Sequence, residues 1–502
     1  MSEQMITVRK ESRWKPMRGL LPMVALLAAG GCATRPINPP ITQADPASGY
    51  RLATRQAHFK SRDDLVILAF SGGGTRAAAF SYGVLEFLRR TEVKRASGEI
   101  VPLLDAVGVI TGVSGGSFTA LAYGLYGDKL FADYEQRFLK RDVQGALIAR
   151  TFNPVYWPRL WSTHWGRSEL AENYYDEILF NGATFADLDR GSGPLILASA
   201  TDLSTGARLV FDQDMFDPIC SNLGAVPLSR AAAASSAVPV VLTPVTMNNY
   251  GGTCNYQAPP SLLLLSGPAG SPQAAARAKH DIDERLAFGD GAARPYLHVV
   301  DGGVADNLGV RSVLDLLEIT ESLQKIGQPT LLDGVRRISI FVVNSVTQHQ
   351  SVFDWEKLER PPGAVAQLSQ ATSVPIEHYS YESVELLKDR AARWRGLRML
   401  RQSAAFAGNT DPAIAAELKG PEAEIYVIDV SFAALALQDP AEADFLKNLP
   451  TSFVLPAEAV DRLRAAAGRI LMASPEFQRL LKSTGATIVA GSAQDVEEPA
   501  PK

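Results

Sequence analysis

The chain has 502 residues, 46% hydrophobic and 21% charged, so it is long enough to bury a large core and unlike a collagen, a coiled coil or a disordered chain. Its net charge of −5 excludes the broad positive field that nucleic-acid binding requires. Its three cysteines are too few for a disulfide-built scaffold, and none lies in a CxxC pair, which argues against a structural zinc site.

The first predicted element is a signal peptide over residues 1–31. Five basic residues precede an uncharged, mostly apolar stretch at 19–29, which is too short to span a hydrocarbon core of about 30 Å. The small residues before Cys32 resemble a bacterial lipobox, although Ala29 stands where that pattern prefers Leu; an ordinary cleaved signal or a chance run of small residues is the alternative. We expect a lipid on Cys32 that anchors the protein in the bacterial envelope. Ala33, rather than Asp, follows this cysteine and favours the outer membrane, facing the periplasm.

A linker and then an α/β unit are expected next. Residues 32–62 are rich in Pro, Thr, Gln and Ala without an apolar period, and we interpret them as a lipidated tether. From residue 63, apolar runs alternate with helical stretches, which predicts parallel strands buried on both faces. The pattern indicates one open α/β sheet rather than a string of small domains. The predicted strands are 65–70, 103–113, 195–203, 207–211, 296–302, 337–345 and 424–432.

A glycine loop, SGGGTR at 71–76, ends the first strand and leads into a predicted helix over 76–90. Successive glycines let the backbone approach a ligand closely and present N–H groups to an anion, as an oxyanion hole does. The loop lacks both the GK[ST] ending of a Walker A sequence and the GxGxxG spacing, which argues against a phosphate loop. A tight connection without a ligand is the remaining alternative.

The second predicted strand ends in GVSGG at 112–116, which matches GxSxG, and a helix is predicted over 117–127. In this context the sharp turn needs small neighbours and raises a serine hydroxyl above the carboxyl edge of the sheet, at a helix N-terminus. Ser114 is therefore the candidate nucleophile, with a plain tight turn as the alternative.

A carboxylate is the best candidate for the group that activates Ser114. Of the six histidines, only His349 and His378 come late enough for an α/β-hydrolase triad, and neither lies in a glycine-bearing loop. Asp301 ends a predicted strand and precedes two glycines. It can therefore lie at the same carboxyl edge as Ser114 and take its proton directly. A capping role in a turn is the alternative for this aspartate.

The motifs GGGTR, GVSGG and DGG, in this order on a strand–turn–helix frame, resemble the patatin-like phospholipase family over residues 63–310. The segment 231–239 (AAAASSAVP) resembles the ASxAxP block of that family. The resemblance implies an α/β/α sandwich with a central, mostly parallel sheet, and cleavage of acyl esters in membrane lipids. Helical elaborations of this fold are expected from the segments 153–165, 259–294 and 350–420. By position it implies Ser114 as nucleophile, Asp301 as base, an oxyanion loop of Gly72, Gly73 and Gly74 with Arg76 supporting it, and motif support from Gly112, Gly116, Gly302 and Gly303.

Two positions depart from that family pattern. Ser71 stands where the family usually has Asp or a similar residue, and Ala77 where it has Gly; both flank the loop rather than the catalytic groups, so they bear on substrate geometry. The implied dyad needs no metal or cofactor, because a carboxylate activates the serine and backbone donors stabilise the oxyanion. We expect a membrane-anchored serine lipid acyl hydrolase of the phospholipase A or lysophospholipase type. An acyltransferase with the same acyl-enzyme and a non-catalytic envelope scaffold are the alternatives.

Cysteines and aromatic residues give further expectations. Once Cys32 carries a lipid, Cys220 and Cys254 remain, and in an oxidising periplasm they could pair across a loop of about 35 residues. The tryptophan cluster at 157–165 and the leucine run at 262–265 are either core or an interfacial lid.

The C-terminal part of the chain is expected to continue the α/β unit. Residues 311–490 hold two of the predicted strands, and one or two long amphipathic helices are predicted over 350–420. Residues 491–502 are expected to be disordered.

Overall fold

The computed structural model describes residues 34–488 apart from 62, 95–97, 260–274, 326, 347–356, 358, 360, 405, 407–410, 412, 413, 415–417 and 419. The expected signal peptide, the lipidation site Cys32, the leucine run at 262–265 and the tail at 491–502 lie outside the described residues. Among the helices that are described, none is long and apolar enough to cross a membrane.

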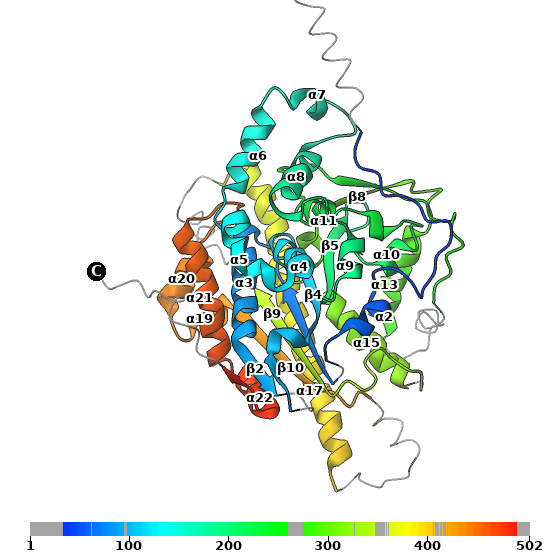
Figure 1. Ribbon diagram of the computed structural model, residues 1–502, viewed down its shortest axis with the longest axis vertical. Coiled ribbons are helices and arrows are strands. Elements are labelled where there is room, and N and C mark those ends of the chain that lie inside the picture. Colours follow the sequence, from blue (N-terminus) through cyan, green and yellow to red (C-terminus); the bar gives the residue numbers. More distant parts are fainter. Residues whose placement is uncertain are drawn as a thin grey trace, which may run out of the picture.

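A mixed, mostly parallel sheet forms the centre of the molecule (Figure 1). Its strand order is β10-β9-β1-β4-β5-β8-β7, and β6 pairs with β5 off this path. The first five strands of that order pair in parallel, whereas β6, β7 and β8 pair antiparallel. The strands are β1 (Asp64–Phe70), β4 (Val107–Val113), β5 (Leu195–Asp202), β6 (Arg208–Val210), β7 (Val245–Asn248), β8 (Tyr296–Asp301), β9 (Arg337–Asn344) and β10 (Glu424–Ser431). A second, small sheet has the order β11-β2-β3, with β2 (Thr91–Lys94), β3 (Ile100–Pro102) and β11 (Thr487–Ile488).

Helices cover both faces of the central sheet, with α3 and α4 in front and α17 behind in Figure 1. The first half of the chain holds α2 (Leu52–Arg55), α3 (Gly74–Arg90), α4 (Gly115–Tyr126), α5 (Leu130–Tyr134), α6 (Val143–Phe152), α7 (Trp157–Leu160), α8 (Arg167–Tyr175), α9 (Phe185–Arg190), α10 (Gln213–Phe216) and α11 (Leu228–Ser235). The second half holds α13 (Ala275–Phe288), α14 (Gly303–Asp306), α15 (Arg311–Lys325), α17 (Ala364–Gln402), α19 (Phe432–Ala436), α20 (Pro440–Lys447), α21 (Ala457–Ala473) and α22 (Pro475–Thr484). The predicted fold class, α/β with a central and mostly parallel sheet, is confirmed.

The central strands are apolar throughout because helices cover them on both sides. Every residue of β4 is buried, and β1 is buried from Leu65 to Phe70. This explains why the sequence shows continuous apolar runs instead of an alternation. The predicted strand at 103–113 begins later than expected, at Val107, because Leu103–Ala106 forms a short 3-10 helix. β7 is absent from the predicted strands, since its four residues alternate between buried and half-buried positions in a short run.

The strand predicted at 296–302 runs in the direction opposite to that expected from a parallel sheet. β8 pairs antiparallel with β5, with Asp301 opposite Ala200. β5 continues beyond Ser199, the partner of the last β4 residue, Val113. Because β8 pairs with this extension, Asp301 approaches the carboxyl edge of the parallel strands from beyond the end of β4. An apolar run does not encode strand direction, which depends on the connections between strands.

Residues 34–61, here called the N-terminal arm, pack on the body of the protein, so the tether expected over 32–62 is wrong for this part. Arg51 forms ion pairs of 2.7 Å with Asp214 and 2.9 Å with Asp217. Because polar contacts hold the arm, its sequence needs no apolar period, and it therefore resembles a linker. The fully buried side chains of the arm are Tyr50, Arg51 and Arg55.

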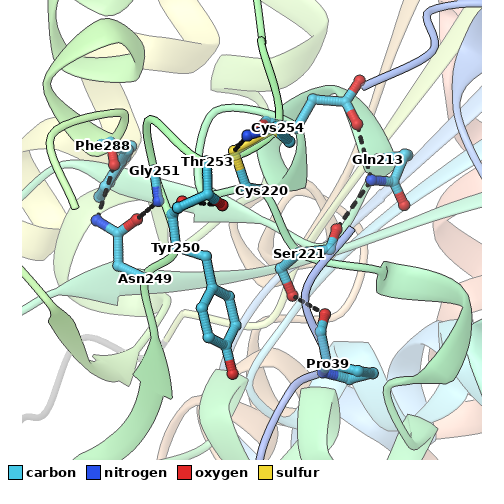
Figure 2. The surroundings of a disulfide bond; sticks show 11 residues. Pro39, Gln213, Cys220, Ser221, Asn249, Tyr250, Gly251, Thr253, Cys254 and Phe288 are labelled. Carbon is cyan, nitrogen blue, oxygen red and sulfur yellow. Dashed lines mark hydrogen bonds between the residues drawn. A yellow bond between two sulfur atoms is a disulfide. The ribbon is translucent and has the colours of Figure 1, made fainter. Parts of the chain in front are cut away.

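A disulfide joins Cys220 and Cys254, whose Cα atoms are 5.5 Å apart (Figure 2). The N-terminal arm crosses this bridge. The N–H of Ile41 donates to the Cys220 carbonyl at 2.9 Å, and the N–H of Ala44 donates to the Cys254 carbonyl at 3.1 Å. Figure 2 shows that the hydroxyl of Ser221, the residue after Cys220, donates a hydrogen bond to the carbonyl of Pro39. The bridge and the arm therefore stabilise one another.

The long helix predicted within 350–420 is α17. It packs on α15 through Arg390, which pairs with Glu321 at 2.7 Å, and through the buried indole of Trp394, which donates to the same carboxylate. β9 and β10 flank this helical segment in the chain and lie in the same sheet as β1. The C-terminal part thus supplies one edge of the central sheet.

Candidate active site

Ser114 occupies the turn between β4 and α4 in a strained backbone conformation. Its φ of 47° and ψ of −120° lie outside the regions that residues with side chains favour. The turn needs glycine neighbours: a Cβ on Gly112 would lie 2.8 Å from the Ser117 Cα, and one on Gly116 would lie 2.6 Å from the Ser71 carbonyl oxygen. Such strain persists where the surroundings hold it, which is common at functional sites. The turn places Ser114 at the N-terminus of α4, where the helix dipole favours negative charge.

The hydroxyl of Ser114 meets the carboxylate of Asp301. Ser114 Oγ donates a hydrogen bond of 2.8 Å to Asp301 Oδ2. The other carboxylate oxygen, Oδ1, accepts the N–H of Gly303 at 2.8 Å. Both members of the pair are buried, with 6% and 7% of their surfaces exposed. The structure therefore brings together the two side chains that the sequence placed at one edge of the sheet, in a geometry that permits direct proton transfer.

Burial sets the acidity of this carboxyl group. It raises the pKa of Asp301 to about 6, and the hydrogen bonds from Gly303 and Ser114 act in the opposite direction. The group is ionised at neutral pH and is a stronger base than an exposed aspartate. It can therefore accept a proton from a serine hydroxyl during attack.

Two residues that the sequence motifs do not identify hold the pair in place. Ser235, the last residue of α11, accepts the N–H of Ser114 on its Oγ at 2.9 Å. Thr201 on β5 donates its hydroxyl to the backbone carbonyl of Asp301 at 2.9 Å. Ser235 lies in the AAAASSAVP segment. The resemblance of this segment to the family block does not by itself assign a role to Ser235. Thr201 has no signal in the sequence, because its contact depends on the register between β5 and β8.

The glycine loop after β1 lies against the turn that carries Ser114. A Cβ on Gly115 would lie 2.0 Å from the Gly74 carbonyl oxygen, and one on Gly72 would lie 3.4 Å from the Ser114 Cβ. Gly73 and Gly74 have φ values of +136° and +61°, a region that favours glycine. The loop and the serine thus approach more closely than residues with side chains would permit.

The glycines of this loop differ in whether their N–H groups are available. The N–H of Gly72 donates to the Asn307 carbonyl at 2.8 Å, so Gly72 cannot donate to an oxyanion as expected. Within the part of the chain that the structure describes, the N–H groups of Gly73 and Gly74 have no acceptor. Gly74 lies against Gly115, the residue that follows Ser114. A run of glycines in a sequence cannot show which N–H a distant carbonyl will occupy.

Arg76 anchors the glycine loop from inside the protein. Its guanidinium donates to the carbonyls of Ser345 and Leu449, at 2.9 and 2.6 Å, and to Thr451 Oγ1 at 3.0 Å. Burial lowers the pKa of Arg76 to about 10, so the side chain stays charged at neutral pH. Its contacts fit the supporting role expected for it, rather than direct contact with an oxyanion.

Ser71, noted above as a departure, takes part in the same support. Its Oγ lies 3.1 Å from Ser345 Oγ and accepts the N–H of Ser345 at 2.9 Å. Ser345 Oγ in turn donates to the Gly72 carbonyl at 3.0 Å. These bonds tie the loop to the end of β9, the neighbour of β1. Ser345 could not be identified from the sequence, because no motif surrounds it.

The two glycines after Asp301 are required by close packing. A Cβ on Gly302 would lie 2.3 Å from the Ser199 carbonyl oxygen, and one on Gly303 would lie 3.1 Å from Asp301 Oδ1. Without side chains here, β8 can turn directly into α14. This turn directs the Gly303 N–H at the carboxylate.

Histidines and metal ligands take no part in the site as described. In the described residues, the hydrogen bond of Ser114 Oγ goes to Asp301 and involves no histidine; His349 lies outside them. The same part of the chain holds no group of three or more His, Cys, Asp or Glu side chains placed to bind a metal ion.

Residues 68–314 match the family described as patatin-like phospholipase. No curated protein matches the chain significantly. Among solved structures, human GIVD cytosolic phospholipase A2 is similar at 13% identity and a TM-score of 0.43, covering 92% of this chain and 66% of that chain. VipD from Legionella pneumophila is similar at 10% identity and a TM-score of 0.28, covering 85% of this chain and 68% of that chain. The chain thus spans just under two thirds of the length of the human structure.

Proposed function

Because residues 68–314 form a patatin-like phospholipase domain, we propose that this chain is a serine lipid acyl hydrolase of the phospholipase A or lysophospholipase type. The observation that carries the proposal is the 2.8 Å hydrogen bond from Ser114 Oγ to Asp301 Oδ2 at a strained turn. In this arrangement Ser114 is the nucleophile and Asp301 is its base.

The first half-reaction forms an acyl-enzyme. Ser114 Oγ attacks the carbonyl carbon of the ester while its proton passes to Asp301 Oδ2. The N–H groups of Gly73 and Gly74 donate to the oxyanion of the tetrahedral intermediate, at the positive end of the α4 dipole. The bond to the alcohol oxygen then breaks. Asp301 returns the proton to that oxygen, and the acyl group stays on Ser114.

The second half-reaction releases the fatty acid. Asp301 accepts a proton from water as the water oxygen attacks the acyl carbonyl, and the same two backbone donors hold the second oxyanion. The bond to Ser114 Oγ breaks, and the serine regains its proton from Asp301. An alcohol in place of water would give acyl transfer, but no observation favours such an acceptor.

Covalent labelling of the full chain with a fluorophosphonate probe tests the nucleophile. We expect stoichiometric labelling that disappears in Ser114→Ala. Ser81→Ala is the matched control, because Ser81 is a buried serine of the adjacent helix α3 whose hydroxyl has no hydrogen-bond partner in the described structure. A Ser114→Ala protein that is folded and still labelled at one site would refute the assignment.

The location of the protein is a second part of the proposal. We propose that a lipid on Cys32 anchors the chain in a bacterial envelope, at the outer membrane and facing the periplasm. Small residues before Cys32 support this proposal. So does the pairing of Cys220 with Cys254, since disulfides form in oxidising compartments. Incorporation of labelled palmitate is expected in the parent chain and not in Cys32→Ala; equal incorporation in both would contradict it.

A further inference from the structure

Exposed apolar side chains of residues 148–161, which include the end of α6 and all of α7, and of the loop 238–241 form a surface that we call the apical face. A soluble protein seldom leaves so many large apolar groups in water without a partner. Trp165, the third tryptophan of the cluster, is buried, so only part of that cluster belongs to the core. The most exposed members, between 40% and 77% accessible, are Ile148, Phe152, Val155, Trp157, Trp161, Val240 and Val241.

Backbone contacts connect this face to the catalytic pair. Arg167, at the start of α8 and just after the tryptophan cluster, donates to the Val240 carbonyl at 2.9 Å. The Ala237 carbonyl accepts the N–H of Asp301 at 3.0 Å, so the loop 238–241 begins directly beside the carboxylate. The loop 238–241, which is one part of the apical face, therefore follows directly on the residue that contacts Asp301, and Arg167 links the start of α8 to this loop.

The segments that form the apical face contain basic residues and no acidic ones. No Asp or Glu occurs between Asp142 and Glu169, and none occurs between Asp217 and Asp281. The chain as a whole carries a net charge of −5, so the acidic residues are concentrated elsewhere. Arginine beside exposed aromatic and aliphatic groups is complementary to an apolar layer with anionic groups at its surface. The arginines between Asp142 and Glu169 are Arg150, Arg159 and Arg167; Arg150 pairs with Glu177 at 2.7 Å, so Arg159 and Arg167 supply the positive charge.

The N-terminal arm begins on the same side of the molecule as the apical face. Arg35 donates to the Thr246 carbonyl at 3.2 Å and lies 5.6 Å from the ring centroid of Tyr296, which is half exposed. Figure 1 shows the described chain beginning at the end of the molecule where α7 lies. Cys32 precedes Thr34 by two residues, which span at most about 7 Å when extended. A lipid attached there would bring a bilayer to the apical face.

We propose that the apical face docks on the surface of an anionic phospholipid bilayer, with Trp157 and Trp161 at the level of the headgroups. The inference rests on the proposed function, which requires an acyl ester to reach Ser114. Indole rings favour the interface between water and hydrocarbon, and the aliphatic side chains gain free energy by leaving water. In this orientation the catalytic pair faces the bilayer that holds its substrate.

Vesicle binding tests the proposal without help from a covalent lipid or from turnover. The full chain carries Cys32→Ala, which removes the acylation site, and Ser114→Ala, which prevents hydrolysis. It is sedimented with vesicles of phosphatidylglycerol and phosphatidylcholine. We expect binding that weakens about tenfold or more when Trp157→Ser and Trp161→Ser are added. Brominated lipids are expected to quench the tryptophan fluorescence of the parent more strongly than that of this variant.

A matched control removes equally exposed apolar groups from the opposite edge of the sheet. Ile100 and Met399 are 63% and 67% exposed, against 62% for Trp161. Ile100 lies on β3, shortly before β4 begins. Met399 follows Arg398, which pairs at 3.7 Å with Glu424 at the start of β10. We expect Ile100→Ser with Met399→Ser to bind vesicles as the parent does.

Three outcomes would overturn the docking proposal. Undiminished binding by the tryptophan variant would do so, as would absence of vesicle binding by the parent. A change in turnover of a soluble short-chain ester, measured with Ser114 restored, would show that α7 is a lid within the enzyme instead. If the chain with Ser114 restored and both tryptophans present does not turn over the soluble ester, the proposed hydrolase is wrong. Vesicle binding would still show whether the apical face docks on a bilayer.

Discussion

Asp301 illustrates how one residue is tuned by its surroundings. Burial raises its pKa to about 6, and the donors Gly303 and Ser114 prevent the value from rising further. An exposed aspartate would be a weaker base, and a fully isolated one would stay protonated at neutral pH. A pKa between these two extremes suits a carboxyl group that must accept and return a proton in each half-reaction.

The pH dependence of turnover follows from this pKa. Asp301 must be ionised to accept the Ser114 proton, so kcat/KM for a soluble ester is expected to fall about tenfold per pH unit below about 6 and to level off above about 7. Circular dichroism at each pH serves as the control for unfolding. A profile that stays flat between about pH 4.5 and 7 in a folded protein would contradict the role of Asp301.

The same shift predicts a cost in stability. The folded pKa of about 6 lies above the ordinary 3.8, so the folded state binds this proton more tightly than the unfolded state. Asp301 therefore lowers the free energy of unfolding as the pH rises from about 4 through 6. We expect Asp301→Asn to abolish turnover yet to raise the free energy of unfolding at pH 8 by about 1–3 kcal/mol, measured by urea denaturation. At pH 4 the two proteins should be nearly equal, and a destabilised variant at pH 8 would exclude this account.

Elements with an apolar period are predictable from the sequence, and elements held by polar contacts are not. Continuous apolar runs identify β1, β4, β9 and β10, because parallel strands covered on both faces need apolar residues at every position. The N-terminal arm lacks such a run, since it is fixed by the Arg51 ion pairs and by backbone bonds to Cys220 and Cys254. Partners far along the chain leave no local pattern, so the composition of the arm wrongly predicts a tether.

The disulfide and the arm predict a joint loss of stability on reduction. The bridge closes a loop with a sequence separation of 34 residues, and opening such a loop is expected to lower the free energy of unfolding by about 3–4 kcal/mol. The arm should loosen at the same time, because Ile41 and Ala44 bond to the two cysteine carbonyls. Thermal denaturation with and without a reductant measures the first effect, and hydrogen exchange of the two amides measures the second.

A variant with Cys220→Ser and Cys254→Ser is the control for that experiment. It should already melt at the lower temperature and should not respond to the reductant. Protection of the Ile41 amide that is unchanged by reduction would show that the arm holds without the bridge.

At the scale of the whole molecule, the sequence predicted the catalytic residues of the site better than the strands and residues that hold them in place. Ser114, Asp301 and the glycine loop stand in motifs, so their meeting at one sheet edge could be expected. The direction of β8 could not, because strand direction depends on the long connection before it. Nor could Ser345, whose bonds to the loop require β9 to pair with β1 across most of the chain.

This long-range pairing predicts that the family-matched segment cannot stand alone. β1 pairs with β9 on one side and with β4 on the other, so a chain that ends at residue 320 would leave the buried edge of β1 without hydrogen bonds. It would also lose the acceptors of Arg76 and the Ser452 carbonyl that accepts the Thr75 N–H. We expect this truncated chain to be insoluble, or to be soluble but unable to turn over an ester. A chain that ends at residue 488 should keep its solubility and its ester turnover. Solubility, circular dichroism and turnover of a soluble ester decide the matter, and an active truncated chain would mean that the glycine loop holds its shape without β9.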